Sequence, residues 1–359
     1  MDRTVLLKSR AFKEKGFDGF LITHDANMLY FAGFPGASCL LFSKDKKDVL
    51  YVYGVNYEQA KAEGKGFHVE LVKRDENLMA KVAAQVKDNA IKKLAFDTLT
   101  IENYRILARG LRGKAKLKPQ GKLIWELREV KDAEELELMR KAAELTCAGM
   151  KAAYEAIRPG VREYEVAAEI EYAMRRKGSW GTAFDTIVAS GERSAFPHGG
   201  CTDRIIQEGD IVVVDIGASY RYYRSDMTRT FVAGKPSEKQ KKIYEIVKTA
   251  QQMAVQNVKA GAKARDIDST ARIIIEKAGY GEKFVHGLGH GIGLEVHEPP
   301  TLNPESKDKL KVGNVVTIEP AVYIAGFGGI RIEDTVLVNE YGAEKLTDGL
   351  YTIEASLKR

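Results

Sequence analysis

The amino-acid sequence predicts an α+β domain made of two similar halves, preceded by a smaller α/β domain. The first third of the chain alternates between helical and strand-like patterns, which is typical of an α/β domain. After it, helical segments are followed by strands, and this order occurs twice; helices kept apart from strands favour the α+β class. Residues 209–228 and 313–335 also repeat one pattern of apolar runs and acids. A single duplication of about 100 residues favours two facing half-domains, because solenoid repeats are shorter than about 50 residues.

Local patterns define the elements expected in the first third. An amphipathic helix is expected over Val5–Lys15, and Gly16 ends it. Helical periodicity returns over Leu78–Asp88. Strands separated by turn residues are expected at Phe20–Thr23, Cys39–Phe42, Val49–Val52 and Lys93–Phe96.

The boundary between the two domains is expected shortly before a long helix. This helix, rich in Ala, Glu, Leu and Lys, runs from Ala133 to about Ile157 and is closed by Pro159-Gly160. We therefore divide the chain into residues 1–123 and 124–359. The duplication starts at the end of this helix, since Ile157-Arg-Pro-Gly recurs as Val258-Lys-Ala-Gly, 101 residues later.

Composition restricts the class of protein. The 359 residues are 44% hydrophobic and 30% charged, as in soluble globular proteins, and no run reaches the roughly 18 apolar residues of a membrane span. The N-terminal residues lack the pattern of a signal peptide, so we expect a cytoplasmic protein without a membrane partner. Cys39, Cys147 and Cys201 fit neither a disulfide framework nor a CxxC site. A basic stretch at 105–122 lacks any nucleic-acid motif, so no nucleic-acid partner is expected.

Acidic residues mark the duplicated segments as a candidate site. In each copy one acid ends an apolar β-branched run and a second lies on the strand that follows, so that Asp215 matches Glu319 and Asp226 matches Glu333. Buried carboxylates are costly unless something positive neutralises them. If the halves pack about a pseudo-twofold axis, all four acids converge, and four like charges cannot stay ionised together without cations.

A histidine-rich segment supplies a nitrogen donor. The run His286–Leu294 contains too many glycines for a helix, and as a strand it places His286 and His290 on one face and glycines on the other, where another backbone can approach. Four carboxylates and His290 carry a charge of about −4, which two divalent ions would cancel. Such ligands suit Mn²⁺, Co²⁺, Fe²⁺ or Zn²⁺. Two adjacent metal ions would activate a shared water and stabilise an oxyanion, which is hydrolytic chemistry.

Simpler interpretations exist for each part of this pattern. A single Asp at a strand end is usually a turn or cap residue. The glycine-rich run resembles a phosphate loop, but its G-x-G-x-G-x-G spacing is not G-x-G-x-x-G followed by a helix. The joint occurrence of duplicated acids, matching strands and an intervening histidine favours a metal site.

The same residues carry a resemblance to a known family. The motifs V-D-I-G-A, S-D-M-T-R-T-F, G-L-G-H-G-I-G-L-E-V-H-E, T-I-E-P and R-I-E-D-T resemble the Xaa-Pro peptidases, prolidase and aminopeptidase P, of the pita-bread metallopeptidase family. The resemblance is essentially full length. It implies a creatinase-like N-terminal domain, a pita-bread catalytic domain, two divalent ions per chain with Mn²⁺ or Co²⁺ favoured, and a homodimer. The implied substrates are proline-containing dipeptides or short peptides.

The resemblance also implies roles for individual residues. The implied metal ligands are Asp215, Asp226, His290, Glu319 and Glu333. Glu319 would also move a proton toward the leaving nitrogen. The implied catalytic or substrate-site residues are His198, His286, His297 and Arg331. Phe184 and Ile187 are expected to form an apolar wall for the proline ring, and they are equally consistent with ordinary core residues.

One departure leaves the substrate length open. Prolidases that cleave only dipeptides often have an arginine just after H-E-x-P, where it holds the substrate carboxylate. This chain reads His297-Glu-Pro-Pro-Thr301 and has no arginine until Arg331, although Lys307 or Lys309 could substitute. The alternatives are a methionine aminopeptidase-like or other pita-bread hydrolase and a non-catalytic pita-bread module that binds protein. The N-terminal domain argues against the first, and the complete ligand set argues against the second.

Overall fold

The computed structural model describes residues 2–64 and 66–356, which form two compact units, Met1–Arg128 and Glu129–Arg359. The division follows helix α6 (Gly121–Arg128), and the boundary expected from sequence at 123/124 falls inside that helix. Each unit has its own buried core. Within the described residues, no helix is long and apolar enough to cross a membrane.

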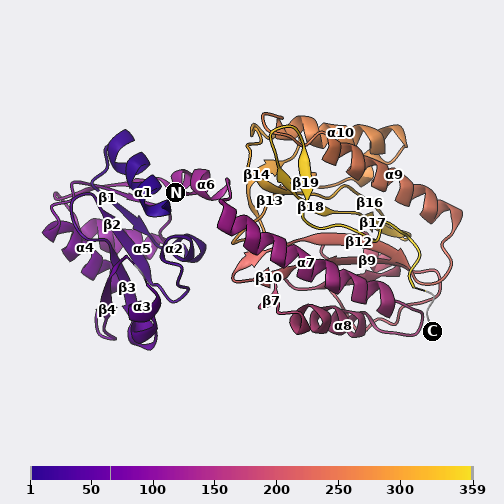
Figure 1. The fold of residues 1–359 in the computed structure, drawn as a ribbon, viewed down its shortest axis with the longest axis horizontal. Helices are drawn as coiled ribbons and strands as arrows, with labels where there is room; N and C mark the ends of the chain where they lie inside the picture. The colour runs from indigo at the N-terminus through magenta and orange to yellow at the C-terminus, as the bar shows by residue number, and fades with distance from the viewer. Residues whose placement is uncertain (1, 65, 357–359) are drawn as a thin grey trace. The chain divides into compact units, whose positions relative to one another are not determined.

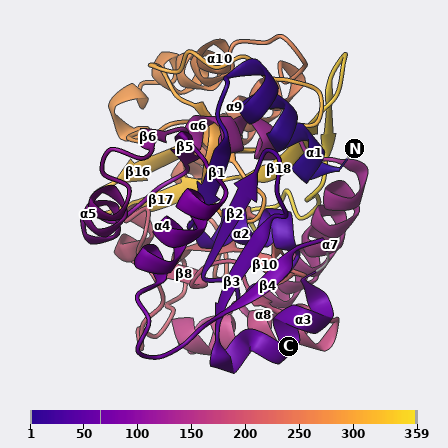
Figure 2. The same ribbon diagram turned by 90° about the vertical axis from the view of Figure 1, so that its left-hand side faces the viewer.

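The N-terminal unit contains a six-stranded mixed sheet in the order β4-β3-β2-β1-β5-β6 (Figures 1 and 2). Strand β2 pairs antiparallel with β1 and β3, while β5 pairs parallel with β1 and β6. The strands are β1 (Gly19–Ile22), β2 (Cys39–Ser43), β3 (Val49–Tyr53), β4 (His68–Val72), β5 (Lys93–Phe96) and β6 (Lys116–Pro119). The expected strands of this region are therefore confirmed, because their apolar β-branched and aromatic residues fill the core on both faces of the sheet.

The helices of this unit also follow the sequence pattern. Helix α4 has the expected bounds, and its buried face repeats at helical spacing. The expected first helix consists of α1 and a π-helical continuation, Ser9–Glu14, and Gly16 follows with a φ of +68°. The α-helices are α1 (Arg3–Lys8), α2 (Asp25–Ala32), α3 (Tyr57–Glu63), α4 (Leu78–Asp88), α5 (Ile101–Gly110) and α6.

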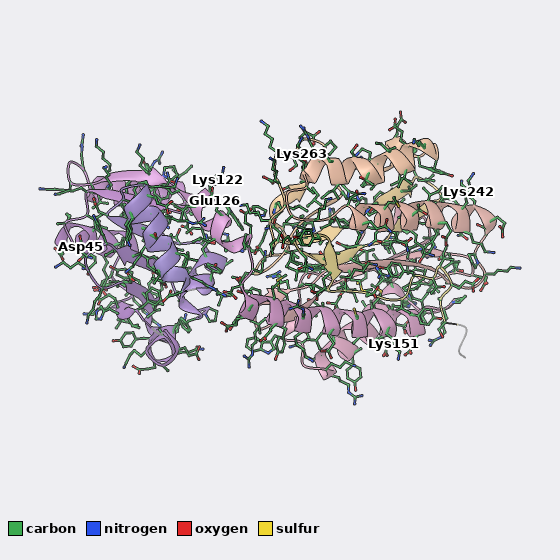
Figure 3. The ribbon with its side chains drawn as sticks, turned by 45° about the horizontal axis from the view of Figure 1, so that its top comes forward. Asp45, Lys122, Glu126, Lys151, Lys242 and Lys263 are labelled. Atoms are coloured by element: carbon green, nitrogen blue, oxygen red, sulfur yellow. The ribbon has the colours of Figure 1, made fainter. Side chains whose placement is uncertain are left out.

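Two helix pairs enclose the strands of the C-terminal unit. Figure 1 shows α7 (Ala133–Ala156) and α8 (Glu163–Arg176) on one side, with α9 (Glu238–Gln256) and α10 (Ala264–Lys277) on the other. Capping boxes begin both long helices: Asp132 with Glu135 for α7, and Ser237 with Gln240 for α9. Figure 3 shows Lys151 and Lys242 projecting from the outer faces of these long helices, as their amphipathic patterns require.

Two antiparallel sheets lie between the helix pairs, in the orders β12-β9-β8 and β14-β13-β15-β18-β19. Two smaller sheets, β11-β10-β7 and β16-β17, complete the unit. The strands of the first half are β7 (Gly181–Thr182), β8 (Ile187–Ser190), β9 (Ile211–Ile216), β10 (Ala218–Tyr220), β11 (Tyr223–Arg224) and β12 (Met227–Val232). Those of the second half are β13 (Gly289–Gly291), β14 (Glu298–Leu302), β15 (Val315–Ile318), β16 (Ala321–Ile324), β17 (Gly328–Arg331), β18 (Asp334–Val338) and β19 (Ala343–Lys345).

The prediction of a nine-residue strand over His286–Leu294 is wrong. Only Gly289–Gly291 forms a strand, and the register with β14 shifts between His290 and Gly291. The predicted close approach of another backbone is correct. A Cβ on Gly289 would lie 2.0 Å from the carbonyl oxygen of Thr317, and one on Gly291 would lie 2.2 Å from that of Pro299. The glycines therefore admit neighbouring strands, but the bulge ends regular pairing.

Candidate metal centre

The duplicated strand pairs place their acids at corresponding ends of two sheets. In the first half, Val212–Val214 lie buried in β9, and Asp215 follows opposite Thr228 of β12. In the second half, pairing between β15 and β18 ends with Ile318 opposite Asp334, so Glu319 and Glu333 stand just beyond it. The apolar runs anchor each strand in the core, which fixes the position of the acid that follows.

The two halves join along a seam between β12 and residues 331–335. The backbone N–H of Glu333 donates to the carbonyl of Thr228 at 3.0 Å, and the Thr228 hydroxyl donates to the Glu333 carboxylate at 2.6 Å. Two residues along, the Thr335 hydroxyl donates to the carbonyl of Asp226 at 2.8 Å. Under the duplication, Thr228 corresponds to Thr335 and Asp226 to Glu333. The seam therefore has the expected pseudo-twofold arrangement, and it brings acids from both halves together.

Three of the five predicted ligands form a compact group. One ligand atom each from Asp226, His290 and Glu333 lies within 4.8 Å of the other two. His290 Nε2 lies 3.9 Å from an Asp226 oxygen and 3.4 Å from a Glu319 oxygen. Its Nδ1 lies 3.0 Å from the carbonyl of Gly291, which can only accept, so Nδ1 carries the proton. The lone pair of Nε2 then faces the carboxylates, as in a metal-binding imidazole.

Unpartnered oxygens show that this donor set fits a cation. Among the described residues, Asp215 Oδ1, Asp226 Oδ1 and Glu333 Oε1 are buried without a hydrogen-bond partner. Buried oxygens are rarely left unpaired, and three of them in one acidic group call for a positive ligand. Four carboxylates and one imidazole are donors that suit divalent first-row metal ions.

Electrostatics support the same conclusion. Burial, with repulsion from the neighbouring acids, raises the pKa values of Asp226 and Glu333 well above their usual range. Burial also raises the pKa of Glu319 to about 8 and lowers the pKa of His290 to about 4. Without a cation, the group therefore favours protonated acids and a neutral imidazole.

Arg331 lies against this group and connects both halves. It is 3% exposed, and its Nη2 donates to Asp215 Oδ2 at 2.6 Å. Its Nε donates to the Thr228 hydroxyl at 3.1 Å, and Nη1 contacts the carbonyl of Pro197 and the hydroxyl of Tyr323. Burial opposes the charge of Arg331, but Tyr323 and Asp215 outweigh it and hold its pKa well above the usual range. The guanidinium therefore fixes the orientation of one predicted ligand.

The other predicted histidines lie beside the acidic group. The ring of His297 lies 4.4 Å from that of His290, measured between centroids. His286 Nε2 lies 3.2 Å from the Tyr323 hydroxyl, and burial lowers the pKa of His286 to about 4. Burial and the neighbouring His198 lower the pKa of His297. His198 is exposed, and it lies close enough to act electrostatically on both His286 and His297.

Comparison with known proteins identifies the family. Residues 137–340 match the model of metallopeptidase family M24, and residues 9–130 match the creatinase/prolidase N-terminal domain. The chain belongs to metallopeptidase family M24. As an M24 protein it has the expected α+β pita-bread unit preceded by a creatinase-like domain, which confirms the predicted fold class.

Its relatives in this family are similar over nearly their whole length. The Xaa-Pro dipeptidase of Pyrococcus furiosus is 44% identical over 93% of this chain and 94% of its own. A solved Xaa-Pro dipeptidase from Bacillus anthracis is 40% identical, with a TM-score of 0.91 and 98% of each chain covered. A solved X-Pro aminopeptidase from Thermotoga maritima is 38% identical, with a TM-score of 0.91 and 99% of each chain covered.

The two predicted apolar residues lie on the first-half sheet of this M24 unit. Ile187 is directly opposite Asp215 in the β8–β9 register, so both side chains share one face. Phe184 is half-buried and packs against Gly217, where a Cβ would lie 2.9 Å from its ring. Ile187 is therefore adjacent to a predicted ligand, while Phe184 lies beside the turn that follows it.

Sequence reasoning missed three hydroxyl groups at the site. Tyr323 links His286 to Arg331, Thr228 binds Glu333, and the Thr317 hydroxyl accepts from the His290 backbone N–H at 3.1 Å. Thr228 and Thr317 each lie two residues from a predicted ligand, at the end of a strand that the ligand adjoins, so the alternation of side chains could have identified them. No comparable local signal marks Tyr323.

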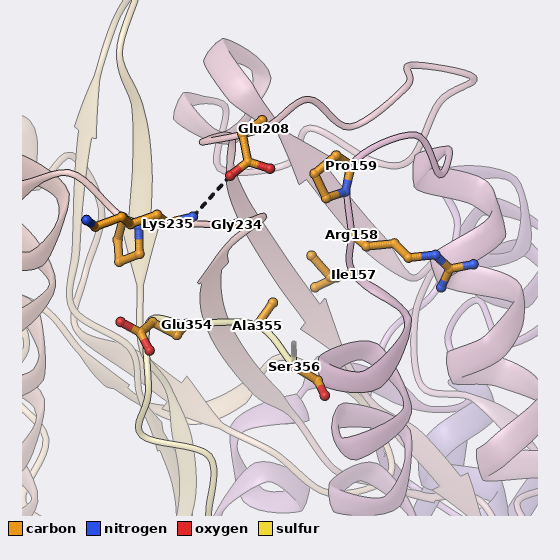
Figure 4. A pocket seen from close by; sticks show the side chains of 10 residues that line it. Ile157, Arg158, Pro159, Glu208, Gly234, Lys235, Glu354, Ala355 and Ser356 are labelled. Atoms are coloured by element: carbon orange, nitrogen blue, oxygen red, sulfur yellow. Dashed lines mark hydrogen bonds between the residues drawn. The ribbon is translucent and has the colours of Figure 1, made fainter. Parts of the chain in front are cut away.

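A well-formed cavity of about 500 Å³ lies elsewhere in the C-terminal unit (Figure 4). None of the residues that line it belongs to the acidic group. Glu208 points into it and accepts from the backbone N–H of Lys235 at 3.3 Å. This cavity is therefore separate from the acidic group.

Proposed function

We propose that this M24 protein hydrolyses the peptide bond between an N-terminal residue and proline in dipeptides or short peptides, with two divalent metal ions. The observation that carries the proposal is the group of buried acids around His290, which contains three carboxylate oxygens without a partner. The similarity to proteins called Xaa-Pro dipeptidase and X-Pro aminopeptidase supports the substrate class.

The proposed ligands of the two ions are Asp215, Asp226, His290, Glu319 and Glu333. Bound ions of this kind supply an activated water and positive charge for an oxyanion. Mn²⁺ and Co²⁺ are the favoured ions, and Zn²⁺ and Fe²⁺ also suit oxygen-rich ligands with one imidazole.

Proton transfer to the leaving group is the proposed task of Glu319. The nitrogen of an Xaa-Pro bond carries no hydrogen, and it must gain a proton to leave as the secondary amine of proline. Glu319 is placed for this task, because its carboxylate lies among the proposed ligands, 3.4 Å from His290 Nε2.

The remaining residues are proposed to bind and orient the substrate. His198, His286 and His297 are proposed to line the substrate site, where a neutral imidazole donates one N–H to the developing oxyanion; His297 lies against His290, and His286 against Tyr323. Arg331 holds Asp215 in place. Ile187 and Phe184 are proposed as the apolar surface for the proline ring, and Ile187 has the stronger support because it lies opposite Asp215.

One assay tests this function. Purified protein is freed of metal, reloaded with Mn²⁺ or Co²⁺, and incubated with Gly-Pro and with Gly-Pro-Xaa tripeptides. We expect release of the N-terminal glycine and about two tightly bound ions per chain. No release with any divalent ion would reject the proposal, and less than about one bound ion would favour the non-catalytic binding module. Release of methionine from Met-Ala peptides in place of Gly-Pro cleavage would favour the methionine aminopeptidase alternative.

The same assay decides the substrate length. Relatives called dipeptidase and aminopeptidase are equally similar in structure, with TM-scores of 0.91 each. No arginine follows His297-Glu-Pro-Pro, and Lys307 and Lys309 are exposed side chains. We therefore propose that tripeptides are accepted along with dipeptides, and cleavage of Gly-Pro alone would correct this.

Location and assembly complete the proposal. The three cysteines are free and Cys201 is exposed, which supports a reducing compartment such as the cytoplasm. A homodimer is proposed from the family resemblance, and light scattering of the purified protein tests it.

A further inference from the structure

Two buried acids outside the metal group each hold a segment that bears a substrate-site histidine. Glu163 lies on α8 in the first half, and Asp268 lies on α10 in the second. Their exposed fractions are 0% and 1%. Such acids are costly to bury unless their oxygens are well paired, so their partners indicate what each acid does.

Glu163 binds both ends of the segment 190–202, which carries His198. Its carboxylate accepts from the backbone N–H and hydroxyl of Ser190 at 2.8 and 2.7 Å, and from those of Thr202 at 2.8 and 2.7 Å. The Arg193 guanidinium donates to the same carboxylate and also to the carbonyl of Gly199. One buried acid therefore ties together the two ends of the loop that carries the histidine.

Other contacts connect the same loop to the metal group. The Ser194 hydroxyl accepts from the backbone N–H of Gly329 at 2.9 Å, and the carbonyl of Pro197 accepts from Arg331 at 3.3 Å. The carbonyls on both sides of His198 are thus bound, that of Pro197 by Arg331 and that of Gly199 by Arg193, which is itself held by Glu163.

Asp268 holds the segment that carries His286. Its Oδ1 accepts from the backbone N–H of Leu288 at 3.0 Å, and both its oxygens pair with Arg272 at 2.9 Å. Arg272 in turn donates to the carbonyls of Phe284 and His286 at 3.0 and 2.9 Å. The acid and its arginine therefore bind the backbone directly before, at and after His286.

The two acids lie on corresponding helices of the duplication, but they do not occupy corresponding positions on them. Helices α8 and α10 correspond, since Val166 and Ile267 align at an offset of 101 residues. Glu163 is the first residue of its helix and Asp268 the fifth. In the first half the arginine comes from the loop, whereas in the second half it comes from the helix. Different residues therefore perform the same task in each half.

We propose that Glu163 and Asp268 are positioning residues that fix His198 and His286, respectively, against the substrate. The proposal rests on the proposed function for the roles of these histidines. Misplacing a substrate-contacting group by about 1 Å costs on the order of 100-fold in rate. Glu163→Gln and Asp268→Asn are therefore expected to lower kcat by about 10- to 100-fold, with unchanged metal binding.

Imidazole NMR tests positioning independently of activity. The chain has six histidines, so the ring signals of the Zn²⁺-loaded protein are few, and His198→Gln and His286→Gln identify the two of interest. Glu163→Gln is expected to shift the His198 signal more than that of His286, and Asp268→Asn to do the reverse. If neither variant moves its own histidine selectively, the proposal is wrong. If wild-type protein hydrolyses no Xaa-Pro peptide, the proposed function fails while these shifts still decide the positioning.

Kinetics separate positioning from general stability. The matched controls are Glu169→Gln on α8 and Asp266→Asn on α10, both exposed acids on the same helices, and these are expected to retain wild-type kcat. A merely structural role predicts a lower Tm but a kcat within about threefold of wild type well below that Tm, and this result would overturn the proposal. If Glu163→Gln or Asp268→Asn does not fold, Thr202→Val and Arg272→Lys weaken the same contacts and are judged by the same measurements.

Discussion

The two halves of the C-terminal unit carry matching acids but surround them differently. Arg331 of the second half crosses the seam to bind Asp215 of the first. Its counterpart Arg224 instead donates to the carbonyls of Leu294 and Ala183. The single imidazole of the group also comes from one half only, as His290. The duplication thus accounts for the negative charge, whereas departures from symmetry supply the arginine and the imidazole that lie against it.

The largest expected effect comes from removing one acid from the shared group. Glu333→Gln and Asp226→Asn replace corresponding residues of the two halves, and each removes a charge that a cation needs. Because metal-ion catalysis is worth several kcal/mol, we expect a loss of about 1,000-fold or more in kcat/KM, with fewer bound ions. Elemental analysis and Xaa-Pro hydrolysis measure both. If either variant retains two ions, the acid that it lacks is not a ligand, and the two halves do not build the site together.

The second effect concerns stability without metal. Burial raises the pKa values of Glu319, Asp226 and Glu333 and lowers those of His286 and His290 to about 4, so the acids and the histidines have opposite effects below about pH 6.5. Between about pH 6.5 and 8 only the acids act, the folded state binds more protons than the unfolded state, and the stability of metal-free protein falls as pH rises. The slope is about 1.4 kcal/mol per pH unit for each group.

Denaturant unfolding at several pH values measures this slope. Protein loaded with Mn²⁺ is expected to lack it, because the ion favours the ionised acids. A metal-free protein whose unfolding free energy stays flat or rises from pH 6.5 to 8 would show that the acids of the two halves do not repel one another.

The two arginines sharpen the comparison directly. Arg331→Lys loses the planar group that contacts Asp215, Thr228 and Tyr323 together, and we expect kcat to fall about 100-fold. Arg224→Lys alters contacts with carbonyl oxygens, and we expect a loss of less than about fivefold. Steady-state kinetics of both variants measure this difference. Equal losses of kcat would contradict a special role for the arginine of the second half.

The smallest effect concerns the threonines of the seam. Thr228→Val removes a hydrogen bond to the Glu333 carboxylate and is expected to weaken metal affinity about tenfold. Thr335→Val removes a bond to the carbonyl of Asp226 and is expected to cost about 1 kcal/mol of stability with little change in affinity. Calorimetric metal titration and thermal unfolding separate these outcomes, and matching affinities would indicate a symmetric seam.

Much of this architecture could be predicted because its signals are local. Strand-forming runs such as Val212–Val214 end at the acids, so the duplicated sequence itself located Asp215 and Glu319. The predicted strand over 286–294 failed because pairing there depends on neighbouring backbones that the alternating glycines only permit. Tyr323, Glu163 and Asp268 could not be identified, since their partners, apart from Arg272, are 8 to 39 residues away and their own positions look like ordinary parts of a strand or helix.

The seam has a consequence for the origin of the molecule. The same pairs of residues meet in both directions, because Thr335 contacts Asp226 as Thr228 contacts Glu333, although the first hydroxyl donates to a backbone carbonyl and the second to a carboxylate. This is the geometry of an isologous dimer of identical chains. An ancestral chain equal to one half of the C-terminal unit could therefore have built the acidic group by self-association. The dissociation constant of that dimer would then have set the fraction of chains with a complete group. Joining the halves in one polypeptide removes that dependence on concentration and lets each half change separately.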